Sequence, residues 1–492
     1  MTTSQSKPQQ QDAPPAGRTN AQRRALAVIA VAQLLLVMDG TLMNIALPRI
    51  QTGLDVSPAA LTWVVTAYAL GFGGLLLVAG RLGDIFGHQR LFTIGMTVFA
   101  VASLIGTVAP NSAVLIAARG LQGVAAAIAA PNALSLISST FPDRADHQRA
   151  MGVYGAMSGL GSTVGLLLGG VLTSYLNWRW ALLINVPIAL WIILNRKALV
   201  QARPSRGRID VWGAVTGTLA AVALVYGATR AGEEEWSDDV VVGCLALAAL
   251  SAVVFVIIQI RSHHPLVPSD VVRSRPRAGA YLTQLLVGAS MFATYYFLTL
   301  HMQSAMGYDA LQTGLAYLPL SVTLAIAAGA VAPRLLQQVS GRAIAAGGLL
   351  LAAVGAGWLS QLEYPTSYAT SIVPATVLIG LGLGLAFVSV TLTGMAGVEP
   401  QKMGAASSVL NTALQIGGAI GMTVLVTRAT QVADARVPGA VAIVGRSESV
   451  GWSQAVDAVT RGYASAFVVV AAIYVVAAAI VVSTFRTQHQ DR

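Results

Sequence analysis

Residues 25–47 read ALAVIAVAQLLLVMDGTLMNIAL, an apolar run that contains one charged side chain, Asp39. A helix of about twenty residues crosses the roughly 30 Å of hydrocarbon in a bilayer. Backbone polar groups in lipid must bond within their own segment, and a helix meets that requirement. The stretch therefore predicts a membrane-spanning helix with an ionisable group inside it.

Further apolar runs of similar length follow along the chain. Of the 492 residues, 55% are hydrophobic and 10% are charged. In soluble domains about a quarter of all residues are charged. The sequence predicts an all-α integral membrane protein with fourteen transmembrane helices, near residues 25–47, 61–79, 91–109, 113–138, 151–172, 180–200, 209–229, 239–260, 279–300, 312–334, 343–360, 368–393, 404–427 and 463–484.

The distribution of basic residues predicts the orientation of these helices. Loops that carry most of the Lys and Arg remain in the cytoplasm. With the N-terminus placed inside, inner segments hold 22 of the 30 basic residues, outer loops hold seven, and Arg119 lies within a span. We therefore expect a multi-pass protein of the bacterial cell membrane with both termini in the cytoplasm.

The order of the spans predicts two six-helix halves with a pair of helices between them. We expect a disordered cytoplasmic tail at 1–24, a first half at 25–200, two linker helices with basic flanking loops at 201–276, a second half at 277–484 and a cytoplasmic tail at 485–492. Transporters often repeat a helical unit and bind substrate at the midplane between the repeats.

Small residues support such a repeat. The fifth span carries Gly161, Gly165 and Gly169, and the thirteenth carries Ala413, Gly417 and Gly421, both sets at steps of four. This spacing puts small side chains on one helix face, where two backbones can approach closely. Either set alone is also typical of ordinary tight packing, but their matching places predict corresponding interfaces.

Ionisable residues deep in the spans are the candidates for chemistry, because charge in lipid is costly. Asp39 lies in the first span and Arg119 in the fourth. Burial favours the neutral form of a carboxyl group, and a nearby cation favours its charged form. Asp39 is our candidate for proton coupling, with Arg119 as its partner. The alternative is a static ion pair that holds two helices together.

Two segments resemble motifs of the major facilitator superfamily. Residues 80–90, GRLGDIFGHQR, resemble its loop motif G-x-L-x-D-r-x-G-r-[KR]. Glycines here predict a tight turn, with Asp84 placed to cap a helix and Arg90 placed to pair across the gap. The motif residues kept in this gating segment are Gly80, Asp84, Gly87 and Arg90. In the fourth span, Arg119, Gln122 and Gly123 match R-x-x-Q-G, whose arginine is implicated in proton transfer in the family.

Three more segments resemble the fourteen-helix drug:proton antiporters of that superfamily. Residues 38–48, MDGTLMNIALP, fit the first-helix signature LD-x-T-x-x-N-x-ALP, and Trp178-Arg179-Trp180 with Asn185-Val-Pro187 fits the start of the sixth helix. The fifth span fits the antiporter motif G-x-x-x-G-P-x-x-G-G at Gly161, Gly165, Gly169 and Gly170. Leu166 replaces its proline, so the local helix distortion that proline causes is lost.

The resemblance covers residues 25–484. It implies the major-facilitator fold, in which two halves alternate access to a central site. It also implies exchange of protons for hydrophobic, often cationic, drugs or antibiotics, as in multidrug resistance. The partners expected are therefore protons, the lipid bilayer and a small lipophilic or cationic substrate.

A midplane substrate site should be mostly apolar, with aromatic, Met and amide side chains that suit flat or cationic molecules. Plain helix packing is the alternative for each residue. The second half has no clear deep carboxylate, which favours monovalent or neutral substrates. The candidates are Asn44, Trp63, Tyr68, Asn132, Met291, Tyr295, Tyr296, Asn411 and Gln415.

Other functions remain as alternatives: a dedicated exporter or importer of one metabolite or, more remotely, a membrane scaffold. An enzyme would need clustered catalytic groups at membrane depth, and the six histidines do not cluster with acids in a span. A single cysteine, Cys244, excludes an intrachain disulfide. We expect no cofactor and no metal, no nucleic acid despite the formal charge of +10, and a monomer driven by the proton gradient.

Overall fold

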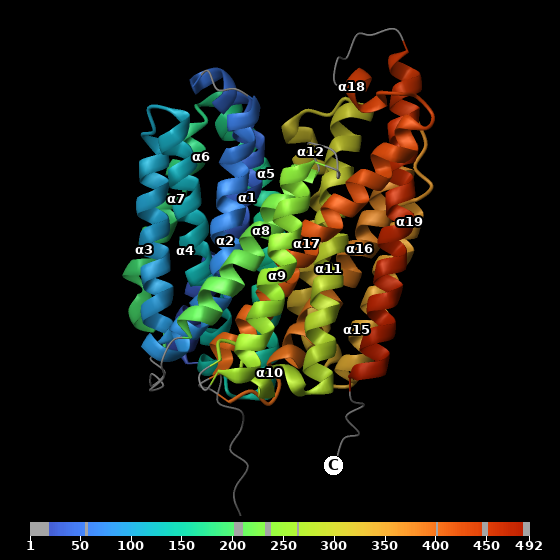
Figure 1. Cartoon of the computed structure of the whole chain (residues 1–492). Coiled ribbons are helices and arrows are strands. Elements are labelled where there is room, and N and C mark those ends of the chain that lie inside the picture. The colour runs from blue at the N-terminus through green and yellow to red at the C-terminus, as the bar shows by residue number, and fades with distance from the viewer. Residues whose placement is uncertain are drawn as a thin grey trace, which may run out of the picture.

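The computed structural model describes residues 19–54, 58–200, 210–231, 238–262, 265–399, 402–444 and 451–485. The remaining parts of the predicted tails, linker loops and outer loops lie outside these ranges. The described residues form helices and short connections, as expected for an all-α membrane protein (Figure 1).

The first part of the chain forms seven α-helices and the linker adds two more. They are α1 (Asn20–Leu54), α2 (Pro58–Phe86), α3 (His88–Thr107), α4 (Ser112–Thr140), α5 (Arg144–Tyr175), α6 (Arg179–Leu183), α7 (Asn185–Leu194), α8 (Val211–Ala231) and α9 (Asp239–Arg261). A 3₁₀ turn, η1 (Arg196–Ala198), follows α7.

The second part includes three π-helical turns among its α-helices. The elements are α10 (Ser269–Arg273), α11 (Arg275–Leu300), η2 (His301–Ala305), α12 (Ala310–Ala316), α13 (Leu318–Ile326), η3 (Ala327–Val331), α14 (Ala332–Leu335), α15 (Gly341–Leu359), η4 (Tyr368–Ile372), α16 (Val373–Met395), α17 (Met403–Asp434), α18 (Ala440–Val444) and α19 (Trp452–Thr484).

Thirteen helical segments among the described residues are long and apolar enough to cross a membrane. The predicted sixth span is the exception. It was expected as one helix at 180–200, but it is a shorter apolar segment, Arg179–Leu194, that breaks at Ile184 between α6 and α7. Pro187 explains the break, because it has no N–H to donate to the carbonyl of Leu183 four residues earlier.

Several helices extend beyond the predicted spans into polar sequence. α1 begins at Asn20, so residues 20–24 of the predicted tail are helical. Between the predicted thirteenth and fourteenth spans, the described residues are also largely helical, because α17 continues to Asp434 and α19 begins at Trp452. Apolar runs mark only the part of each helix that faces hydrocarbon, so sequence hydropathy underestimates these lengths.

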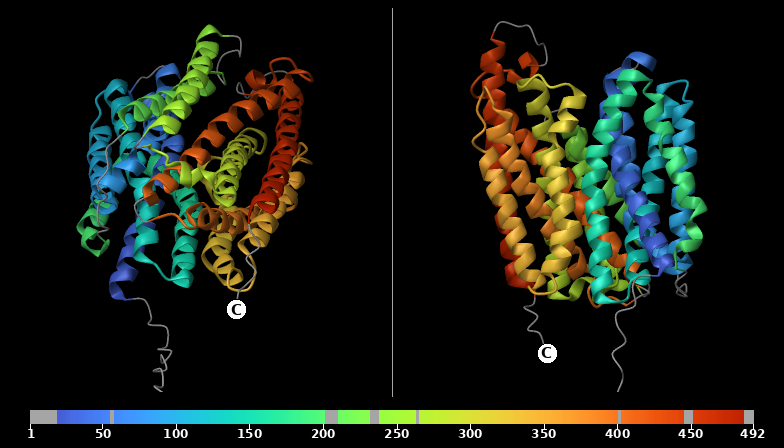
Figure 2. Two further views of the ribbon diagram at one scale, coloured as in Figure 1. Left: turned by 60° about the horizontal axis from the view of Figure 1, so that its bottom comes forward. Right: turned by 180° about the vertical axis from the view of Figure 1, so that it is seen from behind.

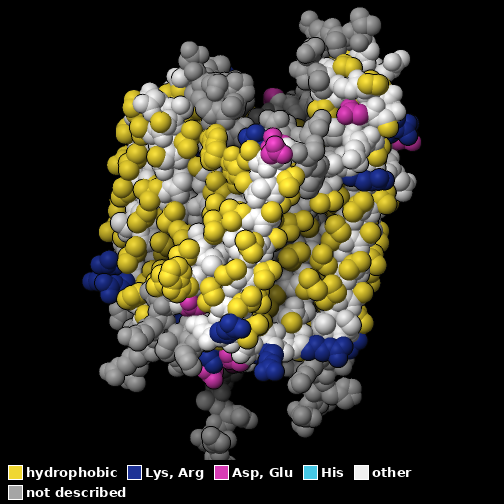
Figure 3. Space-filling model, in the orientation of Figure 1, with side chains coloured by type: hydrophobic (Ala, Val, Ile, Leu, Met, Phe, Trp, Pro, Cys, Tyr) yellow, Lys and Arg dark blue, Asp and Glu magenta, His cyan; other side chains and the backbone are white. Residues whose placement is uncertain are grey.

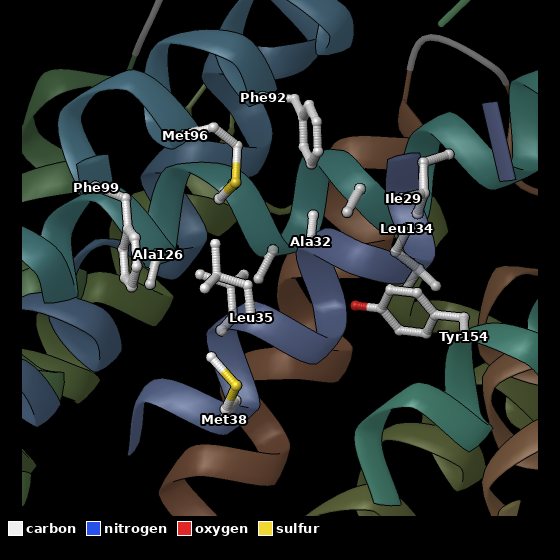
Figure 4. Packing of buried hydrophobic residues seen from close by; sticks show 14 of the residues in the cluster. Ile29, Ala32, Leu35, Met38, Phe92, Met96, Phe99, Ala126, Leu134 and Tyr154 are labelled. Atoms are coloured by element: carbon white, nitrogen blue, oxygen red, sulfur yellow. The ribbon is translucent and has the colours of Figure 1, made fainter. Parts of the chain in front are cut away.

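The helices form two bundles that stand side by side (Figure 2). One hydrophobic core is built mainly from α1 to α7, and a second is built from α11 to α19. Figure 4 shows part of the first core, which includes Leu35 and Met38 of α1 and Met96 and Phe99 of α3. The predicted domain boundaries themselves stay a prediction.

The two glycine-rich faces occupy corresponding places in the bundles. In α5, a Cβ added to Gly165 would lie 2.6 Å from the carbonyl oxygen of Met38 in α1. In α17, a Cβ on Gly417 would lie 2.7 Å from the carbonyl carbon of Leu285 in α11. In each bundle, the fifth long helix therefore packs closely against the first, as the matched spacing predicted.

The linker helices α8 and α9 cover one side of the junction between the bundles. In α8, the carbonyl of Ala228 accepts a hydrogen bond from Thr423 of α17, and Tyr226 contacts the Trp63 ring of α2. α9 packs on α8, and only 17% of the apolar stretch of α9 is buried inside the protein. A broad belt of hydrophobic side chains covers the face shown in Figure 3, as expected of a surface in contact with lipid.

Candidate functional site

Asp39 and Arg119 form a buried ion pair between α1 and α4. Arg119 Nη1 donates to Asp39 Oδ2 at 2.7 Å, and the two side chains are 2% and 0% exposed, respectively. The structure thus brings together the two ionisable residues singled out in the sequence. A buried pair is a poor source of stability, because the cost of desolvating both charges offsets their attraction.

Gln122 connects this pair to α3. It lies one helical turn after Arg119 and accepts from Arg119 Nη1 through Oε1 at 2.8 Å. Its Nε2 donates to Ser103 Oγ at 2.7 Å and reaches Asp39 Oδ1 at 3.4 Å. Both polar atoms of the Gln122 amide are thus used.

Two groups of α2 hold the Arg119 side chain. Arg119 Nε donates to the carbonyl of Val64 at 3.2 Å, and the guanidinium carbon lies 4.5 Å from the centre of the Tyr68 ring. A cation over an aromatic face is stabilised by the negative charge density of the ring. Gly123, which faces the backbone of Tyr68 and Phe72, allows α2 and α4 to approach this closely.

Asn185 completes the site from α7. Its Nδ2 donates to Asp39 Oδ1 at 2.6 Å, and its side chain is fully buried. Sequence reasoning noted Asn185 only as part of a motif and gave it no role. The available signal was Pro187 two residues later, which marks a break in an apolar helix, a common place for a transporter site.

The arrangement can hold one proton at a defined atom. A carboxylate that accepts from Arg119, Asn185 and Gln122 is stabilised in its charged form, and burial opposes that charge. Five helices, α1, α2, α3, α4 and α7, supply the groups of this Asp39 site. Any movement that separates Arg119 from Asp39 would leave a buried charge unpaired, and uptake of a proton would remove that charge.

A second cluster lies where the bundles meet, at the end of the molecule that contains the α2–α3 turn. The sequence predicted that glycines at 80–90 form this turn, but α2 continues to Phe86. Only Gly87, with φ of 95°, has the conformation that a turn glycine provides. Gly80 instead faces Gly404 and Ser408 of α17, where a side chain would collide with the opposite bundle.

Asp84 caps a helix of the other bundle. Its Oδ1 accepts from the backbone N–H of Gly404, the second residue of α17, at 2.9 Å. A carboxylate at this position satisfies a free amide and complements the helix dipole. Arg81 and His88 lie 3.8 Å and 3.5 Å from Asp84. Arg90 is exposed and has no ion pair among the described residues.

Serines of α17 add to this contact. Ser407 donates to the carbonyl of Pro131 in α4 at 2.8 Å, and Ser408 donates to the carbonyl of Leu76 in α2 at 2.8 Å. Together with Asp84, these bonds join the bundles at the α2–α3 end. Sequence reasoning did not predict these bonds, since isolated serines in an apolar helix are common.

The predicted pocket residues do not all lie together. Asn132 belongs to the α2–α3 end, where its Oδ1 lies 2.8 Å from His88 Nδ1. Tyr68 supports Arg119, and Asn411 donates to the carbonyl of Ser407. In α11, the Tyr295 ring packs against Tyr317, and Tyr296 packs against Phe297.

The other pocket candidates have little in common. Met291 and Gln415 are half-buried, and Trp63 is 40% exposed. The side chains of Asn44 and Leu166 lie outside those that the structure describes. The substrate pocket therefore stays a prediction.

The family follows from a comparison with known proteins. Residues 29–422 match the model of the Major Facilitator Superfamily. The chain belongs to the major facilitator superfamily. As a member of this transporter superfamily, it is a multi-pass membrane protein, and the Asp39 site and the α2–α3 contact lie within the matched region.

The similar proteins of this superfamily include several connected with antibiotics. The chain is 41% identical to the puromycin resistance protein pur8 of Streptomyces alboniger, over 95% of this chain and 92% of that protein. It is 38% identical to the cephamycin export protein CmcT of Amycolatopsis lactamdurans, over 83% and 85% of the two chains. It is 34% identical to the lincomycin resistance protein of Streptomyces lincolnensis, over 84% and 85%.

The fold also matches a solved structure. The human organic anion transporter MFSD10 (TETRAN) aligns with a TM-score of 0.61 over 94% of this chain and all of that chain, at 16% identity. At this identity the likeness concerns the fold alone.

Proposed function

We propose that the chain exports hydrophobic or cationic antibiotics or drugs in exchange for protons. The Asp39–Arg119 pair carries this proposal, because a transporter driven by protons needs one buried group that can bind and release a proton. Export agrees with the names of the relatives, which describe antibiotic resistance and export. The protein requires neither an enzymatic step nor a cofactor in this proposal.

Alternating access gives each contact a part in the cycle. The basic loops at the α2–α3 end support an orientation in which this end faces the cytoplasm of a bacterial cell, and in that orientation the bonds of Asp84, Ser407 and Ser408 would close the inner side. Outward exposure would then allow a proton to reach Asp39 and substrate to leave. Rocking of the halves would break the Asp84–Gly404 bond and open the inner side to the next substrate molecule.

A dedicated exporter of one antibiotic is the second candidate. The names of pur8, CmcT and the lincomycin protein each refer to a single compound or compound class. α11 is the counterpart of α1, and it has no Asp, Glu, Lys, Arg or His after Arg277. The lack of a deep carboxylate there favours monovalent or neutral substrates over dications. Export of a dication at the rate of a monocation would contradict this preference.

Dye efflux from a drug-sensitive bacterium tests the proposal. Cells that carry the wild type should expel preloaded ethidium, a protonophore should stop the efflux, and Asp39→Asn should behave like cells without the protein. Asp457→Asn removes an acid of α19 that pairs with Arg461 at the surface, and it should pump normally. Puromycin, cephamycin and lincomycin resistance should be measured in parallel.

The outcomes separate the two candidates. Resistance to one antibiotic without ethidium efflux favours the dedicated exporter. Normal pumping by Asp39→Asn, with equal amounts of protein in the membrane, contradicts proton coupling at Asp39.

A further inference from the structure

Asn185 uses only half of its hydrogen-bonding capacity. Its Nδ2 donates to Asp39 Oδ1 at 2.6 Å, while its Oδ1 is buried and has no hydrogen-bond partner among the described residues. A buried acceptor without a partner is unfavourable, because it has lost its hydrogen bonds to water without replacement. The Asn185 oxygen is therefore an acceptor that the present state of the site leaves unused.

The protonation state of Asp39 decides which atom of the amide it needs. A charged carboxylate only accepts hydrogen bonds, whereas a protonated carboxyl group also donates one. The side-chain amide of Asn185 offers both kinds of group. Rotation by half a turn about χ2 exchanges the positions of Nδ2 and Oδ1 with little displacement of other atoms.

We propose that Asn185 is a positioning residue for the proton on Asp39. With Asp39 charged, Asn185 Nδ2 donates to it, as in the structure. When Asp39 takes up a proton from the aqueous phase, the amide turns and Asn185 Oδ1 accepts from the carboxyl O–H. The significance for transport rests on the proposed proton coupling at Asp39, but the hydrogen-bond exchange can be measured without transport.

Gln122 cannot fill this role, although it also reaches Asp39. Its Oε1 accepts from Arg119 and its Nε2 donates to Ser103 at 2.7 Å. Turning the Gln122 amide would place two donors, Arg119 and the amide nitrogen, against each other. Among the described residues, the Asn185 side chain bonds only to Asp39, so its rotation breaks no bond to another residue.

Few other titratable groups face Asp39. Arg119 of α4 bonds to it directly, and Tyr68 of α2 lies behind the guanidinium. α7, with the sequence NVPIALWIIL, has no titratable residue. α5 presents Gly161 and Gly165 to this part of α1. A change in the protonation of Asp39 in an Asn185 variant would therefore be a direct effect of the lost amide.

Infrared titration of the purified full-length protein tests this role. The carbonyl stretch of protonated Asp39 is identified by its absence in Asp39→Asn, and its intensity is followed against pH. In Asn185→Leu, the charged carboxylate loses a donor, and a hydrogen bond to a charged group is worth about 1.5–3 kcal/mol. The protonated form loses a weaker, neutral hydrogen bond, worth about 0.5–1.5 kcal/mol, so the midpoint should move toward alkaline pH by the difference, about one unit.

The band position gives a second measurement. In Asn185→Leu, the protonated carboxyl group also loses its acceptor, so its carbonyl stretch should move to higher frequency. Asn185→Thr keeps a hydroxyl group that can donate and accept, and both shifts should be smaller. Asn195→Leu is the control, because it makes the same exchange just after α7, where the Asn195 side chain donates to the carbonyl of Trp191. Neither the titration midpoint nor the band frequency should change in this variant.

The results distinguish a failure of the Asn185 role from a failure of the proposed transport function. An unchanged midpoint and band position in Asn185→Leu would overturn the role of Asn185, whatever that variant transports. If the shifts occur as expected but wild-type cells expel neither dye nor antibiotic, the proposed function fails and the Asn185 assignment stands. The expected pattern is a shifted titration together with slowed proton-driven efflux.

Discussion

The two halves of the protein share a packing plan but differ in what they bury. In the first half, Asp39 and Arg119 form an ion pair inside regular α-helices. In the second half, α11 has no Asp, Glu, Lys, Arg or His after Arg277, and three π-helical turns, η2, η3 and η4, interrupt the helices. No π-helix occurs among the described residues of the first half.

This difference shows how a repeated architecture can divide two tasks. Around Asp39, α4 holds Arg119 and Gln122 at fixed distances, and Asn185 begins α7 directly after the break at Ile184. A π-helical turn changes the register of the residues after it and often occurs at functional sites. We infer that the first half serves the proton and the second half adapts to the substrate.

The largest expected effect concerns the buried charge. Arg119→Met leaves Asp39 buried without its cation, and loss of one partner of such a pair costs about 3–5 kcal/mol. In the second half, His301→Leu removes a hydrogen bond to Thr366 and should cost about 1 kcal/mol. Thermal unfolding of the purified proteins measures both.

A double variant provides the control for this comparison. Asp39→Asn combined with Arg119→Met removes both charges and should recover most of the stability without restoring efflux. Equal losses for Arg119→Met and His301→Leu would contradict the division between the halves.

The glycine faces predict a smaller effect that should be similar in the two halves. Gly165→Ala and Gly417→Ala each place a methyl group against the backbone of the first helix of the bundle. Overpacking of this kind costs about 1–3 kcal/mol. Gly347→Ala, where nothing lies within 4 Å, is the matched control. A loss in one half only would show that the two interfaces do not correspond.

The contact between the halves should respond to Asp84→Ala. This change removes a hydrogen bond to a charged group, worth about 1.5–3 kcal/mol, which would increase opening at the α2–α3 end about tenfold or more. Labelling of Ala405→Cys by an impermeant thiol reagent, in a Cys244→Ala background, measures the opening. Asp84→Asn keeps an acceptor and should label more slowly than Asp84→Ala. Equal labelling of all three proteins would rule out this contact as a closure.

The smallest effect is expected at the surface. Lys402 lies 2.8 Å from Asp270, and such exposed pairs contribute about 0–1 kcal/mol. The hydrogen bond from Lys402 lowers the pKa of Asp270, so the contribution is present above the usual pKa of Asp. The stability difference between the wild type and Lys402→Gln should therefore disappear as the pH falls through the lowered pKa. A difference that grows in acid would contradict this sign.

The sequence predicted the parts of the structure that follow from the cost of charge in lipid. Asp39 and Arg119 are 80 residues apart, yet each needs a partner in an apolar interior, so their pairing was foreseeable. Hydropathy likewise predicted the spans, and the matched glycines predicted the α1–α5 and α11–α17 interfaces. Apart from Pro187, nothing in the sequence indicated that the sixth span is broken.

The contacts that sequence reasoning missed depend on how separate helices meet. Asn185 is 146 residues from Asp39, and a neutral amide has no single required partner. Asp84 was expected to cap a helix, but only the arrangement of the two halves shows that the helix is α17. Asn132, which was predicted as a candidate for a midplane pocket, lies beside His88 at the α2–α3 end.

The linker hairpin, α8 and α9, also indicates how a transporter gene could gain two helices. α8 begins beside the end of α9, where Gln259 donates to Asp210 at 3.1 Å, so the hairpin returns to the side on which it starts. Two crossings are the smallest insertion that leaves every later helix with its original direction. Because α9 contributes little to either core, a gene could acquire such a hairpin between two finished halves without repacking them.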